Sequence, residues 1–465
     1  MTNSEIKKIF DLQLSNRAKL AESTASDRKI KLKKLLHYIL KHSEEIQKAV
    51  YSDFKKPSAE VKLTEIFAVT SELKHTIRNL SKWMKPKRVG MPLTFFGSSA
   101  KIYYEPKGIS LIIAPWNFPF QLLVGPFVSA IAAGCPVILK PSEYSPNTSK
   151  FLKNMISELF NEDEAFLIEG ESDISKYLTT LPFDHIFFTG STAVGKLIMQ
   201  EASKNLTSVT LELGGKSPCI VAEDYDLKNA ARRIVWGKFM NAGQTCVAPD
   251  YILINKNYQQ KFISFMKEAI DKYTNKNQQD YEYTQIINKA HLERLKFRLN
   301  ECIENGAKLE IGSQFDEKSN FMEFTVLSNV TSDSPIMKEE IFGPILPILT
   351  YESLDEIEEI ISKNPNPLAL YVFSNNKKLI DRIKTRIKSG ALSINEVVVH
   401  FSHPNLPFGG VNQSGLGKAH GKYGFESFSN AKSIFKQPKY SANLLFYPPY
   451  TKRVNKLIDL LIKYL

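Results

Sequence analysis

The first 80 residues place apolar side chains at a helical period among charged ones. Leu32, Leu35, Leu36 and Ile39 recur at i, i+3, i+4 and i+7 between lysines, and a similar run begins at Ser71. Such a stripe buries one face of a helix and leaves the lysines in solvent. We therefore expect a helical layer that covers a core and carries no site.

From residue 108 onward, short apolar runs alternate with segments of helical pattern such as 120–133 and 148–160. Strand–helix–strand order at this spacing predicts a parallel sheet with helices on its faces. Ligands of such sheets bind beyond the carboxyl ends of the strands. The strands predicted for this first sheet are 108–114, 137–140, 165–169, 185–189 and 209–213.

A second α/β unit is predicted from about residue 212 onward, because apolar strands and helices alternate again. We find no internal repeat and no low-complexity linker in the chain. The predicted strands are 251–255, 324–327, 346–350, 368–373 and 391–395, and the predicted helices are 257–272, 291–305 and 354–362.

Residues 108–139 contain no charged side chain, and by length alone this stretch would fit a membrane span. Prolines and glycines interrupt it too often for one continuous helix, so we expect a buried strand, loop, helix and strand. Glu5 and Lys7 lie where a signal peptide would need its apolar region. We expect a cytoplasmic protein without a transmembrane segment.

Composition places the chain in the globular class, with 43% apolar and 24% charged residues, and its 465 residues suit two domains. The formal charge of +12 raises nucleic acid or an anionic membrane as partners. The lysines are scattered among acids without interleaved arginine and aromatic residues, so we expect no nucleic-acid partner. Four widely spaced cysteines without a CxxC pair indicate reduced thiols.

The C-terminal segment carries one more apolar stripe of helical period, formed by Val454, Leu457, Ile458, Leu461 and Leu465. We expect this stripe to dock on the body of the protein or on a partner subunit. The neighbouring Lys452, Arg453, Lys456 and Lys463 would also permit contact with a membrane surface.

Candidate chemistry begins at residues 185–196, where a buried strand runs into Gly190 and then into a helix that contains Gly195. This arrangement aims backbone N–H groups and a positive helix end at an anion. The segment nearly matches the phosphate loop of nucleoside triphosphatases. Leu197 stands where that loop needs a magnesium-binding hydroxyl, which weakens this alternative.

Five further side chains lie where a site is expected. Cys246 follows a glycine in a short polar segment, and a lone cysteine can be either a nucleophile or an inert buried thiol. Glu212 ends an apolar strand, where a carboxylate is costly unless it faces a cleft or has a partner. Asn117 follows another strand and offers an N–H donor for an oxyanion, or fixes its loop. Lys140 and Glu143 follow a third strand and could hold ribose hydroxyls, or could be surface charges.

His400 and His403 lack further ligands at suitable spacing, so we expect no metal site. We place both near the substrate entrance.

Taken together, these segments resemble the aldehyde dehydrogenase family. They occur in the order and with the spacing of that family from about residue 105 to 435, so chance similarity is negligible. The matching segments are PWNFP at 115–119, KPSE at 140–143, FTGSTAVG at 188–195, LELGGK at 211–216, GQTC at 243–246, EEIFGP at 339–344 and PFGG at 407–410.

The short N-terminus, PLALYVFS at 367–374 and YPPY at 447–450 are similar to the class 3 branch of this family. Its members are typically dimers that act on medium-chain, fatty or aromatic aldehydes. The segment VNQSG at 411–415 departs from the sequence that is usual in animal class 3 members. This departure favours a bacterial origin, and it makes the substrate assignments of the animal members less transferable to this chain.

The resemblance implies a fold of three parts. A Rossmann-like NAD(P)-binding domain comprises 1–85 and 106–211, and an α/β catalytic domain comprises 212–415. A small β extension for oligomerisation, with the C-terminal tail, comprises 86–105 and 416–465.

The resemblance also implies a mechanism. The Cys246 thiolate attacks the aldehyde, while Asn117 and the backbone N–H of Cys246 stabilise the oxyanion. Hydride then passes to the nicotinamide, and Glu212 activates the water that hydrolyses the thioester to the acid.

The implied cofactor contacts are Lys140 and Glu143 at the ribose, and Glu340 with Phe342 at the nicotinamide end. Residues 189–195 would lie by the pyrophosphate, through Thr189, Gly190, Ser191 and Gly195. Trp236 and Phe401 would line the aldehyde tunnel. Because a carboxylate at Glu143 repels a 2′-phosphate, we expect NAD with NADP tolerated. A homodimer is implied.

Two alternatives stay open at this point. A catalytically idle relative would bind without turnover, although Cys246, Glu212 and Asn117 are all present. A triphosphatase would release phosphate with magnesium even after Cys246→Ser.

Overall fold

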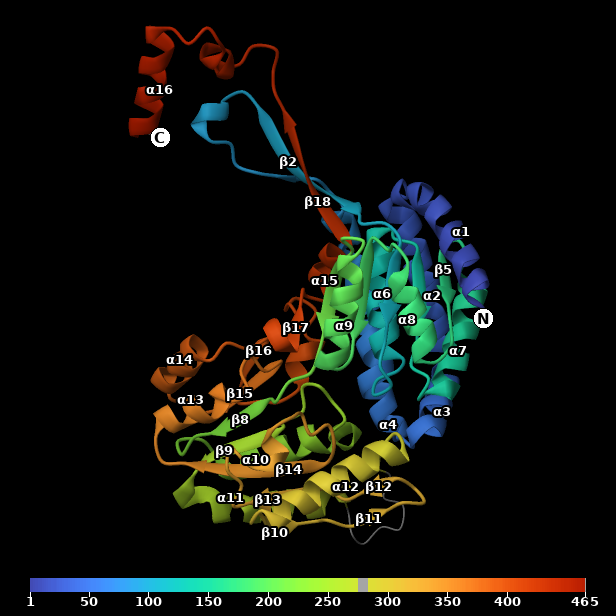
Figure 1. The fold of residues 1–465 in the computed structure, drawn as a ribbon, viewed down its shortest axis with the longest axis vertical. Coiled ribbons are helices and arrows are strands. Elements are labelled where there is room, and N and C mark those ends of the chain that lie inside the picture. The colour runs from blue at the N-terminus through green and yellow to red at the C-terminus, as the bar shows by residue number, and fades with distance from the viewer. Residues whose placement is uncertain (275–282, 465) are drawn as a thin grey trace.

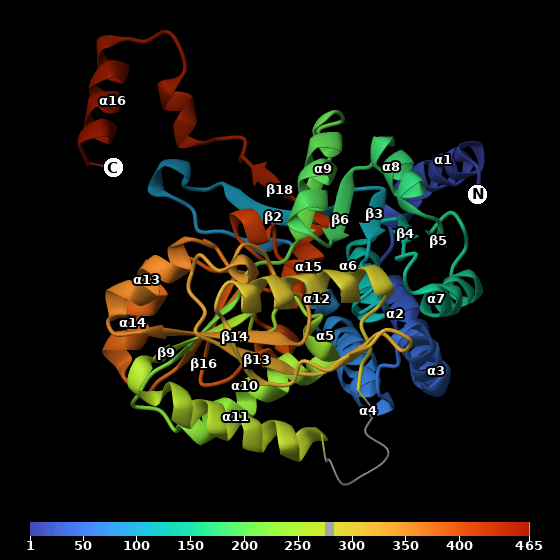
Figure 2. The same ribbon diagram turned by 60° about the horizontal axis from the view of Figure 1, so that its bottom comes forward.

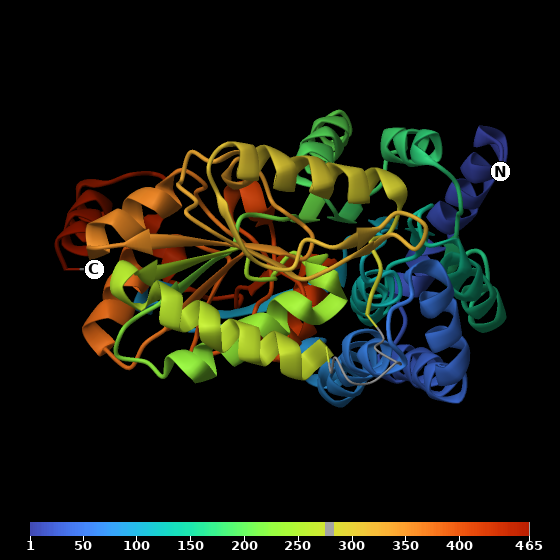
Figure 3. The same ribbon diagram turned by 90° about the horizontal axis from the view of Figure 1, so that it is seen from below.

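The computed structural model describes residues 1–274 and 283–464. Two α/β bodies face each other, and an extended arm leaves one of them (Figure 1). The predicted α/β class is confirmed. The same two bodies are seen side by side from below in Figure 3.

The N-terminal residues form the expected helical layer, and Leu32, Leu35 and Ile39 are fully buried in it. Thr2 and Thr24 cap the first two helices through reciprocal side-chain and backbone hydrogen bonds. The layer consists of α1 (Asn3–Ala21), α2 (Ala25–Lys41), α3 (Ser43–Phe54), α4 (Ser58–Val61), a π-helical stretch (Lys62–Phe67) and α5 (Ala68–Trp83).

The first body contains a six-stranded sheet of order β17-β7-β6-β3-β4-β5, parallel except for β17. Alternate side chains of each strand pack on opposite layers: α2, α3, α5, α6 and α7 on one face, and α1, α8 and α9 on the other. The strands are β3 (Ser110–Ile113), β4 (Val137–Lys140), β5 (Ala165–Leu167), β6 (His185–Thr189), β7 (Ser208–Glu212) and β17 (Gly415–Leu416). The helices are α6 (Gln121–Ala133), α7 (Pro146–Leu159), α8 (Ser172–Thr180) and α9 (Thr192–Ser203).

The second body contains a seven-stranded sheet of order β10-β13-β14-β9-β8-β15-β16, parallel except for β10. Helices α10 and α11 cover one face, and α12, α13 and α14 cover the other (Figures 2 and 3). The strands are β8 (Pro218–Val221), β9 (Tyr251–Asn255), β10 (Lys308–Ile311), β13 (Thr325–Ser328), β14 (Ile345–Tyr351), β15 (Ala369–Phe373) and β16 (Ala391–Ile394). The helices are α10 (Leu227–Phe239), α11 (Gln259–Thr274), α12 (Lys289–Glu304), α13 (Leu354–Ser362) and α14 (Lys377–Arg386), and β11 (Phe315–Asp316) pairs with β12 (Phe321–Met322).

The sequence grouped residues 416–465 with the bridging segments. In the structure, β17 pairs with β7 of the first sheet, and α15 (Gly421–Ser427) packs on α5 and α6. Of this C-terminal group, only the residues beyond α15 enter the arm.

The arm is a three-stranded antiparallel sheet of β1 (Lys87–Arg88), β2 (Ser99–Pro106) and β18 (Ser429–Lys436). The chain then continues to α16 (Lys452–Tyr464), which lies away from both bodies (Figure 1). The expected C-terminal stripe falls on α16, except Leu465, which lies outside the described residues. Among the described residues, no helix combines the length and apolar character needed to cross a membrane.

Candidate active site

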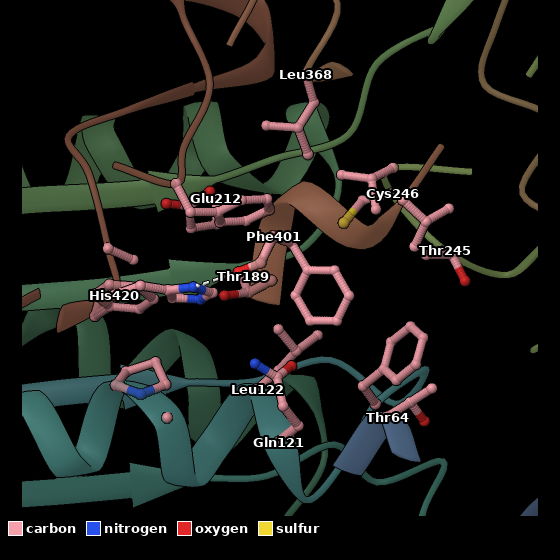
Figure 4. A pocket seen from close by; sticks show the side chains of 18 of the residues that line it. Thr64, Gln121, Leu122, Thr189, Glu212, Thr245, Cys246, Leu368, Phe401 and His420 are labelled. Carbon is pink, nitrogen blue, oxygen red and sulfur yellow. Dashed lines mark hydrogen bonds between the residues drawn. The ribbon is translucent and has the colours of Figure 1, made fainter. Parts of the chain in front are cut away.

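A pocket opens between the first sheet and the loops of the second body. Thr189 and Glu212 reach it from the carboxyl ends of β6 and β7, and Cys246 reaches it from the second body (Figure 4). Much of the remaining wall is apolar, formed by Phe118, Leu122, Pro126, Phe187, Met240, Val247, Leu368, Val398, Phe401, Phe408 and Ala419.

Cys246 follows a tight 3-10 turn, Met240–Gly243, at the end of α10. Asn241 and Ala242 have left-handed backbone torsions there, with φ of 56° and 50°, and such strain is often concentrated at functional sites. Burial raises the pKa of the Cys246 thiol, and the nearby carboxylates of Glu340 and Glu212 raise this pKa further.

Asn117 and the nucleophile turn are joined by hydrogen bonds. The Asn117 side-chain N–H donates to the carbonyl of Gln244 at 3.0 Å. The Asn241 side chain donates to the carbonyls of Asn117 at 2.9 Å and Gln244 at 3.0 Å. The first-body loop that carries Asn117 is thereby fixed to the loop that carries Cys246.

Glu212 is 5% exposed, and neither carboxylate oxygen has a hydrogen-bond partner among the described residues. Burial raises its pKa well above the ordinary value, and Lys418 opposes this shift only in part. The α-carbon of Gly409 lies against this carboxylate, since an added Cβ would come 2.8 Å from Oε1. A carboxylate of raised pKa is a stronger base than an ordinary one, so the unpaired Glu212 can act as a general base.

Glu340 lies across Gly214, where an added Cβ would come 1.9 Å from its Oε2. Burial and the Asp250 carboxylate raise the pKa of Glu340 to about 8. Asp250 is itself paired with the buried Lys216 at 2.6 Å. Phe342 contacts the Trp116 ring edge to face, with centroids 5.4 Å apart.

Lys140 ends β4 with its side chain 1% exposed, and its ammonium donates to the carbonyl of Pro141 at 2.7 Å. Burial lowers the pKa of Lys140. Glu143 lies 3.9 Å from this ammonium and is partly exposed. A lysine and a glutamate thus lie together beyond the carboxyl end of a central strand.

Helix α9 begins directly after β6, and Ser191 caps it by accepting the N–H of Val194. An added Cβ at Gly195 would lie 2.6 Å from Leu213, so glycine allows the helix to approach β7 closely. An added Cβ at Gly190 would likewise lie 2.5 Å from the ring of Phe188. The resulting free helix terminus beside Thr189 can hold an anion.

The structure separates the two tunnel residues expected from the sequence. Phe401 lines the pocket, whereas Trp236, on α10, is not among its described lining residues. Trp236 instead packs with the hydrophobic cluster under Cys246. His403 is exposed, and burial lowers the pKa of His400 to about 4. Within residues 1–274 and 283–464, no cluster of three His, Cys, Asp or Glu side chains could hold a metal ion.

Sequence reasoning missed a buried charged group under the site. The Glu60 carboxylate accepts the backbone N–H of Asn241 at 2.6 Å. Glu65 accepts the N–H of Gln121 at 2.8 Å and pairs with Lys56 at 3.1 Å. Lys56 and Glu65 are both fully buried, and charges inside the predicted helical layer were the available signal.

The model of the "Aldehyde dehydrogenase family" matches residues 1–434. The putative aldehyde dehydrogenase AldX of Bacillus subtilis is 45% identical over 93% of this chain and 98% of its own. The 4,4'-diaponeurosporen-aldehyde dehydrogenase of Staphylococcus aureus is 44% identical over 91% of this chain and 92% of its own.

Solved structures agree with this assignment. The substrate-bound state of Staphylococcus aureus AldH superimposes with a TM-score of 0.94 at 42% identity, covering 98% of this chain and 99% of that one. An NAD⁺ complex of an aldehyde dehydrogenase from Bacillus cereus has a TM-score of 0.86 at 27% identity, covering 94% of this chain and 89% of that one. The resemblance drawn from the sequence motifs is thereby confirmed. This chain belongs to the aldehyde dehydrogenase family, whose members are oxidoreductases that use a nicotinamide cofactor to oxidise aldehydes to acids.

Proposed function

We propose that the protein oxidises a medium- or long-chain aliphatic or an aromatic aldehyde to its carboxylic acid, through a thiohemiacetal and a thioester on Cys246. The observation that carries this proposal is the shared pocket of Cys246 and Glu212. A nucleophile and an unpaired carboxylate of raised pKa face one apolar space, as acyl transfer to water requires.

In the first step, the Cys246 sulfur bonds to the aldehyde carbon and the carbonyl π electrons move to oxygen. The thiol proton must first leave, and Glu212 and Glu340, both of raised pKa, are acceptors near it. One Asn117 N–H donates to Gln244, and the other is left for the oxyanion together with the backbone N–H of Cys246.

When bound, the nicotinamide supplies the acceptor for the hydride that the carbon loses, which leaves a thioester on Cys246. Glu212 then takes a proton from water while the water oxygen bonds to the thioester carbon. The bond from carbon to sulfur breaks, so the acid leaves and the thiolate returns. Glu212 has no competing hydrogen bond among the described residues, so it is free for this proton.

The residues beyond the first sheet fit an NAD(P) cofactor. We assign Lys140 and Glu143 to the adenosine ribose, and Glu340 with Phe342 to the nicotinamide end. Thr189, Gly190, Ser191 and Gly195 would surround the pyrophosphate at the start of α9, where two glycines are packed too tightly to accept a side chain.

NAD should be preferred and NADP tolerated, because the Glu143 carboxylate repels a 2′-phosphate. A mouse relative that is 41% identical is named "dimeric NADP-preferring", so the preference is not a property of the whole branch. Equal kcat/KM with the two cofactors would overturn this part of the proposal.

A homodimer in the cytoplasm completes the proposal. The arm and α16 extend away from their own chain, which supports their use in subunit contact (Figure 1). We retain residues 1–85 and 106–211 as the cofactor-binding domain and 212–415 as the catalytic domain, with 86–105 and the chain beyond α15 bridging subunits, while α15 stays with the first body.

The test is NADH formation with a panel of aldehydes that vary in chain length and aromaticity. Wild-type protein should reduce NAD with aliphatic chains of medium or greater length or with aryl aldehydes, and Cys246→Ala should lose this activity by at least about 10³-fold. Absence of NADH with every aldehyde, or an active Cys246→Ala variant, would overturn the proposal.

A further inference from the structure

The wall of the pocket that α6 forms carries two polar side chains, Gln121 and Ser129, beside the apolar Leu122 and Pro126. Gln121, Gly125 and Ser129 lie at i, i+4 and i+8 on α6, and all three line the pocket. Residues at this spacing share one face of a helix, so they form a continuous strip. Gln121 and its neighbour Leu122 are seen in Figure 4 on the α6 side of the pocket, across from Cys246.

The strip is buried but has no partner. Gln121 is 8% exposed and Ser129 is 5% exposed. Neither side chain has a hydrogen bond to any described residue, although the backbone N–H of Gln121 is taken by Glu65. A buried amide that lacks a partner is destabilised, so an occupant that pairs with it is favoured over one that does not.

Two other polar side chains of the pocket are already engaged, whereas the hydroxyls of Thr189 and Thr245, like the Glu212 carboxylate, also lack a partner among the described residues. Thr64 donates its hydroxyl to the carbonyl of Glu60, and His420 bonds through Nδ1 to the carbonyl of Phe401 while its ring stacks on Phe408. Gly125 between Gln121 and Ser129 has no side chain, which leaves the strip open to an occupant. An entirely apolar occupant would leave the Gln121 amide unsatisfied.

The charges around the strip select against anions. Gln121 and Gly125 also line a second cavity that is continuous with the pocket wall, and Glu72 lies in that cavity. Glu65 bonds the backbone of Gln121, and Glu212 lies in the main pocket. The Glu65 charge is balanced by Lys56, but neither cavity has a lysine or arginine among its described lining residues that could pair with an anion. The Gln121 amide both donates and accepts, which suits a neutral hydroxyl, ether or carbonyl oxygen.

We propose that this α6 strip is a specificity subsite for a neutral oxygen function that the aldehyde carries away from its reacting carbonyl. The inference rests on the proposed function and deepens it. The preferred substrates are therefore oxygenated aldehydes within the apolar class, such as hydroxylated or alkoxylated aryl or alkyl aldehydes, and aldehydes with a second carboxylate are disfavoured.

The test compares kcat/KM for pairs of aldehydes that differ only in a hydroxyl or a methyl group at the end remote from the aldehyde. The pairs are para-substituted benzaldehydes and ω-substituted alkanals of increasing length. For at least one pair, the ratio of hydroxyl to methyl should be about tenfold higher in wild type than in Gln121→Met, which keeps the volume and removes the amide. Ser129→Ala should lower the ratio in the same direction by a smaller factor.

Gln260→Met is the matched control, because Gln260 is exposed on α11 and its variant should keep the wild-type ratio. A ratio that changes less than about twofold in both Gln121→Met and Gln121→Asn for every pair would overturn the subsite. If either Gln121 variant fails to fold, the other carries the same comparison. Wild-type protein that oxidises no aldehyde would instead refute the proposed function, so the two failures are distinguishable.

Discussion

At the scale of single residues, the site combines ionisable groups whose charged forms are disfavoured by burial. The pKa of the Cys246 thiol and that of the Glu212 carboxyl are both raised, and the carboxylates raise the pKa of the thiol. Burial thus disfavours the thiolate and the carboxylate relative to the neutral thiol and the protonated carboxyl. Reaction therefore begins with loss of a proton, and we expect kcat/KM to rise with pH through the neutral range.

This burial also predicts how Glu212 affects stability. The folded-state pKa lies above the unfolded value of about 4.5, so folding favours the protonated carboxyl and stability falls as pH rises above that value. Glu212→Gln removes the ionisable group, and with it this loss of stability at higher pH. Thermal unfolding should show a Tm gain of about 2 °C at pH 8 that disappears near pH 4.5. A gain of equal size at both pH values would contradict the shifted pKa.

At the scale of elements, the nucleophile turn depends on segments distant in sequence. The N-terminal helical layer contacts it through Glu60, and the Gly343 backbone packs closely on Gly243 of the turn. These contacts give a reason for the left-handed torsions of Asn241 and Ala242 to persist in the folded state.

Glu60→Leu should remove the acceptor of the Asn241 N–H and release the turn. We expect kcat to fall by about 10²-fold, because small displacements of a nucleophile cost this much. Glu60→Gln keeps an acceptor oxygen and should recover most of the rate. Steady-state kinetics and the alkylation rate of Cys246 by iodoacetamide check this, and equal loss in both variants would show that the contact is not the cause.

A substitution at Gly243 tests the contact between the nucleophile turn and the Gly343 backbone. Its φ is +70°, and an added Cβ would lie 2.3 Å from the carbonyl oxygen of Gly343, so Gly243→Ala forces two backbones apart. Gly306 is the matched control, since its φ of +93° carries similar strain with no atom within 4 Å. Gly306→Ala should cost about 1–2 kcal/mol of unfolding free energy and retain activity. Gly243→Ala should lose activity, and urea unfolding with turnover assays would reveal whether the two behave alike.

The elements show how far sequence reasoning reaches. Helices with strong periodicity, such as α2, were predicted because a single pattern determines which face is buried. Strand β6 was predicted from its continuous apolar run before Gly190. Strand β8 was missed, since four buried residues after a glycine pair give little periodicity. Glu60 and Trp236 show the limit for the site. The hydrogen bond of Glu60 to Asn241 and the packing of Trp236 on the cluster near Cys246 depend on contacts between segments far apart in the chain.

At the scale of the whole molecule, the arm and the C-terminal segment that follows it expose apolar side chains in the single chain. Leu445, Tyr447, Ile462 and Tyr464 are each at least 60% exposed. Exposed apolar side chains gathered on one extension are typical of protein contact surfaces.

We predict a particle of twice the 52.8 kDa of one chain in analytical ultracentrifugation. A chain ending at Lys436, which lacks the segment with α16, should shift toward monomer, because that segment presents the exposed apolar side chains. A full-length protein that stays monomeric at micromolar concentration would contradict the dimer.

The central claim is that Cys246 forms a thioester that Glu212 helps water to hydrolyse. The most direct measurement is rapid mixing of Glu212→Gln with NAD and an aldehyde that the wild type oxidises. The claim predicts a burst of about one NADH per active site, then turnover slower by about 10²-fold or more, with an acyl adduct on Cys246 by mass spectrometry. Wild-type turnover without a burst or adduct would contradict it.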